Sequence, residues 1–226
     1  MLSVALVSAV CAAGTLTPEK YDLDWRMKIS ESYTKEASKT KSVNLLFLGD
    51  SIMHGWTMTW MKHNGMNIWK GELGGYSKLN FGLSGDKVQN LLWRITEGKQ
   101  LDGTRAAVIV LMIGTNNIIK GDSVQDIADG IQNLLKILRE KQPDAQIILL
   151  GIPPVAWKMK ESAALNPLIE KLADNDKIVY VNLAPLFLGV DGKTKNLHDG
   201  LHPDEAGYKA VADKLIPVFN QIPGKK

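Results

Sequence analysis

The chain has 226 residues, 45% of them hydrophobic and 23% charged, which is typical of a globular protein with one sizeable core. Its 27 lysines and arginines nearly balance its 24 aspartates and glutamates, so the formal charge is only +3. This balance argues against a nucleic-acid-binding protein, and the thin basic cluster of Lys35, Lys39 and Lys41 is typical of a solvated helix face.

The chain begins with an apolar segment, LSVALVSAVCAAG, at residues 2–14. It is shorter than the roughly 20 residues that cross a bilayer, so we do not expect an integral membrane protein. Its position and its small residues at Ala12 and Ala13 are typical of a secretory leader, which favours a secreted or periplasmic protein. A basic start is missing, so an N-terminal arm on a cytoplasmic protein is the alternative. We therefore predict a leader or arm at 1–14 and a single domain at 15–226.

Five short apolar segments are predicted to be buried strands. They are Val43–Leu48, Lys78–Phe81, Ala106–Ile113, Gln146–Gly151 and Ile178–Leu183. Three of them are almost continuous aliphatic runs, as expected for parallel strands that are covered on both faces.

Helical patterns separate these strands, at residues 25–38, 87–97, 123–141, 160–174 and 204–221. The pattern at 123–141 is the clearest, because its aliphatic residues recur on one helical face and Ser123 with Asp126 forms an N-cap signature. Pro217 is expected to kink or shorten the last helix. The alternation predicts an α/β three-layer sandwich with a flavodoxin-like, five-stranded parallel sheet.

Polar loops follow four of the strands, and in a parallel sheet they meet at one edge. Ser51 follows the first strand, Gly85 the second, Asn116 the third, and Asp199 with His202 the fifth. This set suits acyl transfer. A serine hydroxyl needs a base such as His202, and a carboxylate such as Asp199 orients the imidazole. The backbone amides of Ser51 and Gly85 and the side-chain amide of Asn116 can then stabilise an oxyanion.

Other interpretations of these residues fit less well. GLSGD at 82–86 resembles a nucleophile elbow with Ser84 as nucleophile, but Asp86 replaces the glycine that the tight turn needs. HDGLH at 198–202 resembles a zinc motif, but Gly200 and Pro203 oppose the helix that such a motif requires. His54 lies too close to Ser51 in the chain to be aimed at it, so we expect it to line or cap the pocket.

The blocks GDS, NFGLSGD, GTNN and DGLH, in this order, resemble the SGNH (GDSL) hydrolases. The resemblance extends from about Trp25 to the end of the last helix and is strongest to the branch that contains the platelet-activating-factor acetylhydrolase catalytic subunits. It implies Ser51 as nucleophile, Gly85 and Asn116 in the oxyanion hole, His202 as base and Asp199 as its partner. It also implies that neither a metal nor an organic cofactor is needed. Ser84 departs from the pattern, since close relatives often have glycine there.

We therefore expect a serine ester hydrolase that removes short acyl groups, acetyl above all, from carbohydrate or lipid esters. An O-acyltransferase with the same triad and a non-catalytic carbohydrate-binding protein are the alternatives. The candidate substrate-binding residues are Asp50, His54, Ser84, Trp157 and His198. Trp56, Trp60 and Trp69 are expected to fill the core beneath a loop. The expected partner is a small-molecule or glycan ester. The sequence leaves the oligomeric state open between monomer and homodimer.

Overall fold

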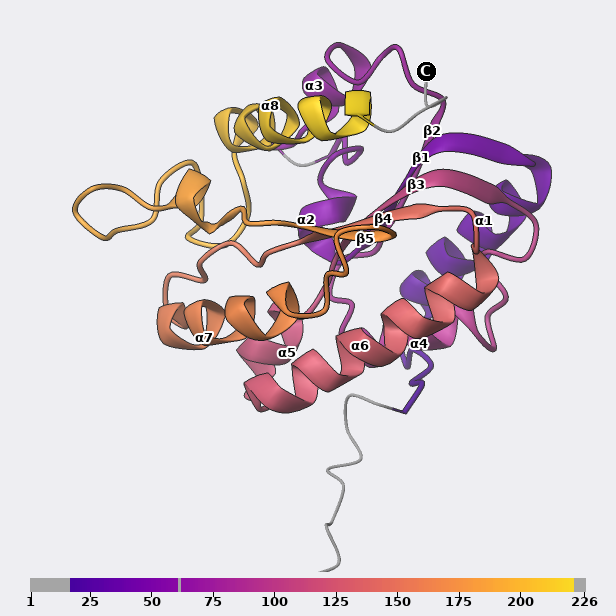
Figure 1. The fold of residues 1–226 in the computed structure, drawn as a ribbon, viewed down its shortest axis with the longest axis horizontal. Coiled ribbons are helices and arrows are strands. Elements are labelled where there is room, and N and C mark those ends of the chain that lie inside the picture. Colours follow the sequence, from indigo (N-terminus) through magenta and orange to yellow (C-terminus); the bar gives the residue numbers. More distant parts are fainter. Residues whose placement is uncertain (1–16, 61, 222–226) are drawn as a thin grey trace, which may run out of the picture.

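A computed structural model describes residues 17–60 and 62–221, and its centre is one parallel sheet with the strand order β2-β1-β3-β4-β5 (Figure 1). The strands are β1 (Ser42–Gly49), β2 (Lys78–Gly82), β3 (Arg105–Met112), β4 (Gln146–Leu150) and β5 (Ile178–Val181). The aliphatic residues of β1, β3 and β4 are almost completely buried. The predicted five-stranded parallel sheet is therefore confirmed.

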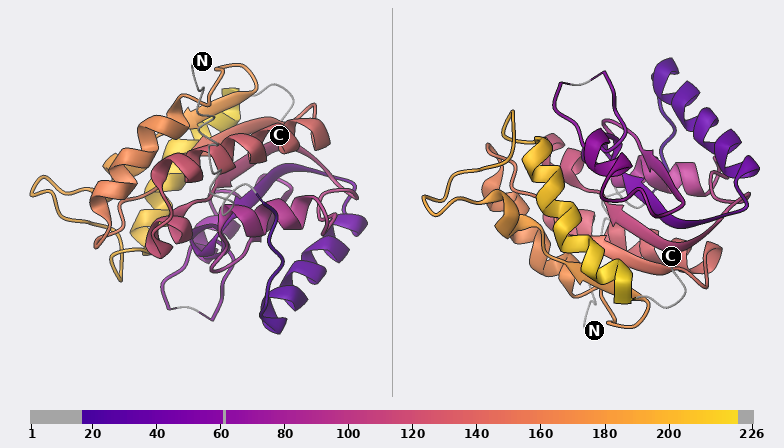
Figure 2. Two further views of the ribbon diagram at one scale, coloured as in Figure 1. Left: turned by 90° about the horizontal axis from the view of Figure 1, so that it is seen from below. Right: turned by 90° about the horizontal axis from the view of Figure 1, so that it is seen from above.

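Helices cover both faces of this sheet (Figures 1 and 2). One face carries α4 (Val88–Ile95), α5 (Thr115–Lys120), α6 (Val124–Lys141) and α7 (Met159–Glu170), which contact one another. The other carries α2 (Ser51–His54), α3 (Met66–Lys70) and α8 (Glu205–Gln221). Helix α1 (Asp24–Lys39) lies beside β2, where the ring of Tyr33 stacks on Phe81 at 5.0 Å between centroids.

The long helices match the sequence pattern, whereas several boundaries differ from it. Ser123 caps α6 as predicted, by accepting a hydrogen bond from the Asp126 amide at 3.1 Å. Helix α8 continues through Pro217 to Gln221, so Pro217 does not shorten it, and the alternative expectation of a kink stays a prediction. Strand β5 ends at Val181 rather than at Leu183, because the Asn182 side chain accepts from the Ala184 amide and starts the 3₁₀ turn η1 (Ala184–Phe187).

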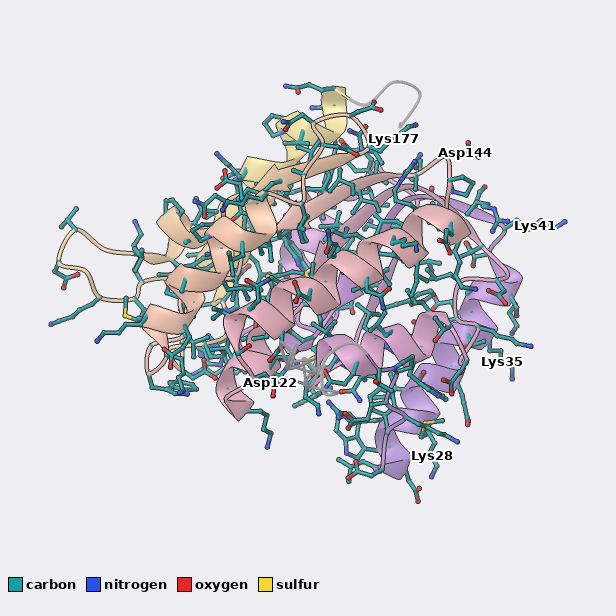
Figure 3. All side chains as sticks on the ribbon, turned by 60° about the horizontal axis from the view of Figure 1, so that its bottom comes forward. Lys28, Lys35, Lys41, Asp122, Asp144 and Lys177 are labelled. Atoms are coloured by element: carbon teal, nitrogen blue, oxygen red, sulfur yellow. The ribbon has the colours of Figure 1, made fainter. Side chains whose placement is uncertain are left out.

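Side chains of both charges, among them Lys28, Lys177, Asp122 and Asp144, lie in different parts of the view in Figure 3. Lys35, Lys39 and Lys41 are exposed, as expected for a solvated helix face. The predicted leader or arm at 1–14 lies outside the described residues. Within 17–60 and 62–221, no helix is both long and apolar enough to cross a lipid bilayer.

Candidate active site

The turn from β1 into α2 presents Ser51. Asp50 is the N-cap of α2 and accepts a hydrogen bond from the Ile52 amide at 3.0 Å, so the helix begins directly at Ser51. The first amides of a helix have no acceptor within the helix, which leaves the Ser51 N–H available to a ligand. The abrupt Gly-Asp-Ser ending of the first strand is therefore a capped helix start that holds a serine at the carboxyl edge of the sheet.

The structure brings together three side chains that the sequence separates widely. Ser51 Oγ lies 2.9 Å from His202 Nε2, and His202 Nδ1 lies 2.7 Å from Asp199 Oδ2. The other carboxylate oxygen, Asp199 Oδ1, accepts the backbone amides of Leu201 at 3.0 Å and His202 at 2.7 Å. Partial burial raises the pKa of the Asp199 carboxyl, but the hydrogen bonds from the His202 amide and ring outweigh this and lower the pKa to about 2. The carboxylate is thus ionised and fixed toward the imidazole.

Gly85 and Asn116 line the same surface hollow. Gly85 has a φ of +81°, a left-handed conformation that strains any residue with a Cβ. Among the described residues, its N–H donates to no protein acceptor. The Asn116 amide donates to the Asp86 carbonyl at 2.9 Å, which fixes the side chain against the Gly85 loop and leaves its second N–H. This arrangement suits an oxyanion hole, and the roles of both residues stay predictions.

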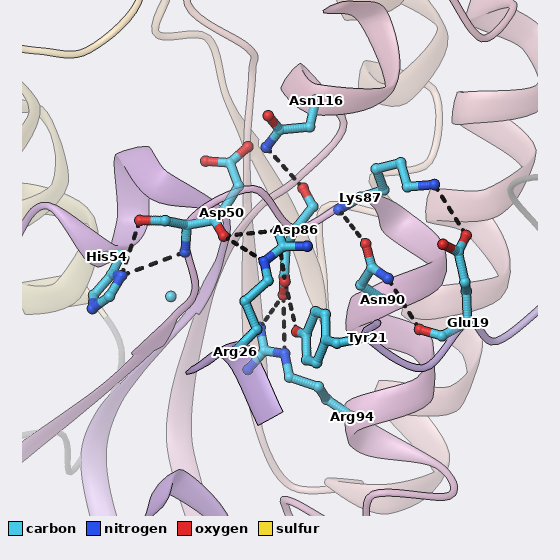
Figure 4. Close-up of polar contacts among 12 residues, drawn as sticks. Glu19, Tyr21, Arg26, Asp50, His54, Asp86, Lys87, Asn90, Arg94 and Asn116 are labelled. Atoms are coloured by element: carbon cyan, nitrogen blue, oxygen red, sulfur yellow. Dashed lines mark hydrogen bonds and ion pairs between the residues drawn. The ribbon is translucent and has the colours of Figure 1, made fainter. Parts of the chain in front are cut away.

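A buried ion pair supports the loop of residues 84–86 from below (Figure 4). Arg94 donates to Asp86 Oδ2 from Nη2 at 2.7 Å and from Nε at 3.0 Å, and both side chains are completely buried. Its Nη1 also donates to the Phe81 carbonyl at 2.8 Å and to Gln100 Oε1 at 2.7 Å. The Tyr21 hydroxyl donates to Asp86 Oδ1 at 2.6 Å. Asp86 is therefore a structural anchor rather than the final residue of a nucleophile elbow.

His54 and Ser84 contact each other rather than the Ser51–His202 pair. His54 Nδ1 lies 3.1 Å from Ser84 Oγ and 3.4 Å from the Ser84 amide. Burial lowers the pKa of His54 to about 4, so the ring stays neutral and Nδ1 accepts. His54 therefore tethers the 84–86 loop to α2, which agrees with a capping role. Asp50 is completely buried, so the expectation that it contacts substrate is wrong.

Two further histidines lie beside His202. The ring of His198 stacks on His202 with 5.9 Å between centroids and on His63 with 4.7 Å. His198, Asp199 and His202 form a group, found in the part of the chain that the structure describes, whose possible ligand atoms lie within 4.8 Å of one another. No helix spans 198–202, in agreement with the sequence, since α8 starts at Glu205. The Nδ1 atom of His202 and the Oδ2 atom of Asp199 are already engaged in their mutual hydrogen bond, so they are not free to bind a metal ion.

The tryptophans that follow Ser51 in the sequence differ in how deeply they are buried. Trp56 is 1% exposed and packs against Phe47 and Trp69, so the expected core role holds for Trp56 and Trp69. Trp60 is 76% exposed, so the expectation that it fills the core is wrong. Trp157 is 56% exposed, and the amide of the preceding Ala156 donates to the carbonyl of Gly200 in the catalytic loop. Trp157 therefore lies where a substrate could reach it.

Sequence reasoning missed the residues that hold the 84–86 loop, namely Tyr21, Arg26 and Arg94. Arg94 carried a usable signal, because it interrupts the apolar stretch LLWRI on a helix and a charge in such a place implies a buried partner. Tyr21 and Arg26 lie near the start of the described chain, far in sequence from the loop they contact, and no local pattern marks them.

The comparisons with known proteins agree with this geometry. A family model, the GDSL-like Lipase/Acylhydrolase family, matches residues 47–210. The chain is 29% identical over 185 residues to the platelet-activating factor acetylhydrolase IB subunit alpha1 of Bos taurus, which covers 79% of this chain and 75% of the bovine protein. A solved structure of a protein from Streptococcus pneumonia has a TM-score of 0.71 at 22% identity and covers 86% of this chain and 94% of its own. A carbohydrate acetylesterase family member from Sinorhizobium meliloti has a TM-score of 0.61 at 20% identity, with coverages of 81% and 99%.

Proposed function

Because the chain belongs to the GDSL-like Lipase/Acylhydrolase family and is a carboxylic ester hydrolase, we propose that it removes short acyl groups, acetyl above all, through an acyl-serine intermediate. The observation that carries this proposal is the hydrogen-bonded series from Ser51 Oγ through His202 to Asp199, with distances of 2.9 and 2.7 Å. A nucleophile, a base and a residue that orients the base are the parts that covalent ester hydrolysis needs.

In the first half of the reaction, Ser51 Oγ attacks the ester carbonyl carbon and His202 Nε2 takes the hydroxyl proton. The carbonyl π electrons move to oxygen, and the oxyanion is stabilised by the N–H groups of Ser51, Gly85 and Asn116. When the tetrahedral intermediate collapses, the C–O bond to the alcohol breaks and His202 returns its proton to the leaving alkoxide. Asp199 keeps the Nδ1 proton in place and stabilises the imidazolium.

In the second half, water replaces the alcohol. His202 removes a proton from water, hydroxide attacks the acyl carbon, and collapse of the second tetrahedral intermediate releases the carboxylic acid. The proton on His202 returns to Ser51 Oγ, so the enzyme ends in its starting state. The base in both halves is His202, whose Nε2 lies 2.9 Å from Ser51 Oγ.

The alcohol part of the substrate is proposed to be a carbohydrate or a lipid. The relatives include a platelet-activating factor acetylhydrolase subunit, whose name indicates the removal of an acetyl group. The exposed indole of Trp157 beside the catalytic loop offers a flat surface to a sugar ring or an acyl chain. Hydrolysis rates with a panel of acetylated sugars and acetylated lysophospholipids show which kind of alcohol the wild-type protein prefers. The same rates measured for Trp157→Ala show whether the indole contributes to that preference.

Labelling of the nucleophile tests the reaction itself. We expect the wild-type protein to release nitrophenol from p-nitrophenyl acetate and to react with a fluorophosphonate at Ser51, as located by peptide mass spectrometry. Ser51→Ala should lose both properties while keeping its circular dichroism spectrum, whereas Ser84→Ala should still be labelled at Ser51. Incubation with a chelator should leave the activity unchanged. Full activity in Ser51→Ala would disprove the assignment, and a strong loss on chelation would favour a metal-dependent reaction instead.

A further inference from the structure

The guanidinium of Arg26 contacts the loop that carries Gly85, although Arg26 lies on α1, outside every motif in the sequence. Arg26 Nε lies 3.0 Å from the carbonyl oxygen of Ser84, and Nη2 lies 2.7 Å from the same oxygen (Figure 4). Two N–H groups of one cation therefore converge on a single carbonyl. Such charge-assisted hydrogen bonds are roughly twice as strong as neutral ones.

The carbonyl of Ser84 and the N–H of Gly85 belong to the same peptide group. The peptide bonds in the described residues are trans, so this C=O and this N–H point in opposite directions. A cation bound to the carbonyl therefore fixes the orientation of the N–H on the far side. The cation also polarises this peptide group, so that the partial positive charge on the Gly85 N–H increases. This N–H is the end that would face an oxyanion.

We propose that Arg26 is a positioning residue of the oxyanion hole, which aims and polarises the Gly85 N–H by holding the Ser84 carbonyl. This inference rests on the proposed function, since it assigns a role within the same ester hydrolysis. Preorganised dipoles are effective in catalysis because they do not have to reorient when charge develops. Arg26 supplies this preorganisation for a peptide that no regular secondary structure holds.

Other contacts of Arg26 and of the loop agree with this role. The Arg26 side chain is only 12% exposed, and its Nη2 lies 4.0 Å from Asp86 Oδ1. The guanidinium also lies over the ring of Tyr21, with 4.9 Å between its central carbon and the ring centroid. A Cβ on Gly85 would clash with Arg26 Nη2, so glycine at this position is what lets the cation approach the peptide. Arg26 is thus held in place before any substrate binds.

A hollow on the surface gives access to Arg26. It has a volume of about 370 Å³, and its lining includes Arg26, Gly85 and Asn116. Shortening Arg26 to alanine would extend this hollow to the Ser84 carbonyl. A small guanidinium ion from solution could then occupy the vacated position, which provides a test that depends on the chemistry of the missing group rather than on the fold.

The experiment compares Arg26→Met, which keeps the apolar stem, with Arg26→Lys and with Lys28→Met. Lys28 is an exposed cation on the same helix. Removing an oxyanion-hole donor outright lowers kcat about 10²–10³-fold, so misaiming one should lower it about 10–100-fold in Arg26→Met. KM for p-nitrophenyl acetate should change much less than kcat, and Arg26→Lys should fall in between. Lys28→Met should match the wild-type protein.

Two further measurements separate positioning from a general loss of structure. Amide exchange of Gly85, followed by NMR, should speed up in Arg26→Met while the amides of β1 and β3 keep their protection. Millimolar guanidinium chloride should restore part of the kcat of Arg26→Ala, whereas the same concentration of sodium chloride should not.

The possible failures are distinguishable. If the wild-type protein hydrolyses the ester but kcat and Gly85 exchange are unchanged in Arg26→Met, the role of Arg26 is overturned. It is also overturned if Arg26→Met and Lys28→Met lose the same activity, or if KM alone responds. If the wild-type protein does not hydrolyse esters, the proposed function fails, and Gly85 exchange still shows whether Arg26 fixes the peptide.

Discussion

Replacing Asp50 with asparagine is expected to remove a pH dependence that the wild-type protein shows in its folding stability. The Asp50 carboxyl is completely buried. Burial raises its pKa from 3.8 to about 7, although the hydrogen bond from the Ile52 amide opposes the rise. Asparagine keeps an oxygen for that amide but carries no charge at any pH.

The sign of the effect follows from the direction of the pKa change. Because the pKa is higher in the folded state, the unfolded chain releases this proton first as the pH rises above about 4. The stability that neutral Asp50 contributes is therefore complete below pH 4 and is lost as the pH rises through 7. A rise from 3.8 to about 7 corresponds to about 4 kcal/mol, at roughly 1.4 kcal/mol for each pKa unit.

Urea unfolding between pH 4 and pH 8.5 measures this difference, with the intrinsic tryptophan fluorescence, to which the buried Trp56 contributes, as a reporter. The free energy of unfolding of Asp50→Asn minus that of the wild-type protein should grow by about 4 kcal/mol from the lowest to the highest pH. Asp144→Asn, which removes an exposed carboxylate, is the matched control and should run parallel to the wild-type curve. Parallel curves for Asp50→Asn would refute the reasoning, because Asp50 would then be ionised in the folded protein throughout.

Three other variants test the parts of the site separately. Asp199→Asn should lower kcat about 10⁴-fold, since an amide no longer holds the His202 tautomer that accepts the serine proton. Arg94→Met should cost about 3–5 kcal/mol in the free energy of unfolding, because it leaves the Asp86 carboxylate buried without its cation; urea unfolding measures the loss. Asn116→Ala should lower kcat about 10²–10³-fold with a smaller effect on KM for p-nitrophenyl acetate.

A double variant serves as the control for Arg94→Met, and the remaining kcat decides the other two cases. The double variant with Asp86→Asn and Arg94→Met should recover part of the stability that Arg94→Met loses, since no charge is then left unpaired. An additive loss in the double variant would show that the ion pair is not the source of the effect. Retention of a tenth or more of the wild-type kcat in Asp199→Asn or Asn116→Ala would contradict the role given to that side chain.

The sheet could be predicted because its strands carry their own signal. Buried parallel strands read as aliphatic runs whatever surrounds them, so β1, β3 and β4 were located to within two residues. The short helices α2, α3 and α5 were not predicted, because four to six residues span less than two helical turns and no apolar spacing can repeat in them. The start of α2 depends on one capping carboxylate, Asp50, which the sequence analysis assigned to substrate binding instead.

The residues at the strand ends could also be predicted, because parallel topology alone sends them to one edge. The residues that hold the 84–86 loop in place could not be predicted from the sequence. Arg26 on α1 reaches Ser84 across 58 positions of the chain, and Tyr21 reaches Asp86 across 65. Such contacts depend on where α1 rests against the sheet, and a single sequence holds no periodicity that reports the docking of one helix.

The distance between Ser51 and His202 depends on the docking of α8 against α2 rather than on either loop alone. Tyr208 lies on α8 shortly after the catalytic loop, and its buried hydroxyl donates to the Ile52 carbonyl at 2.9 Å, next to Ser51. Its ring also packs against Trp56, with 4.8 Å between centroids. The hydrogen bond from Tyr208 to Ile52 is thus a second contact between α8 and α2, and it lies close in the chain to both His202 and Ser51. For this reason the GDS and DGLHP stretches, inspected separately, predict the chemistry that they can perform but not that they meet at 2.9 Å.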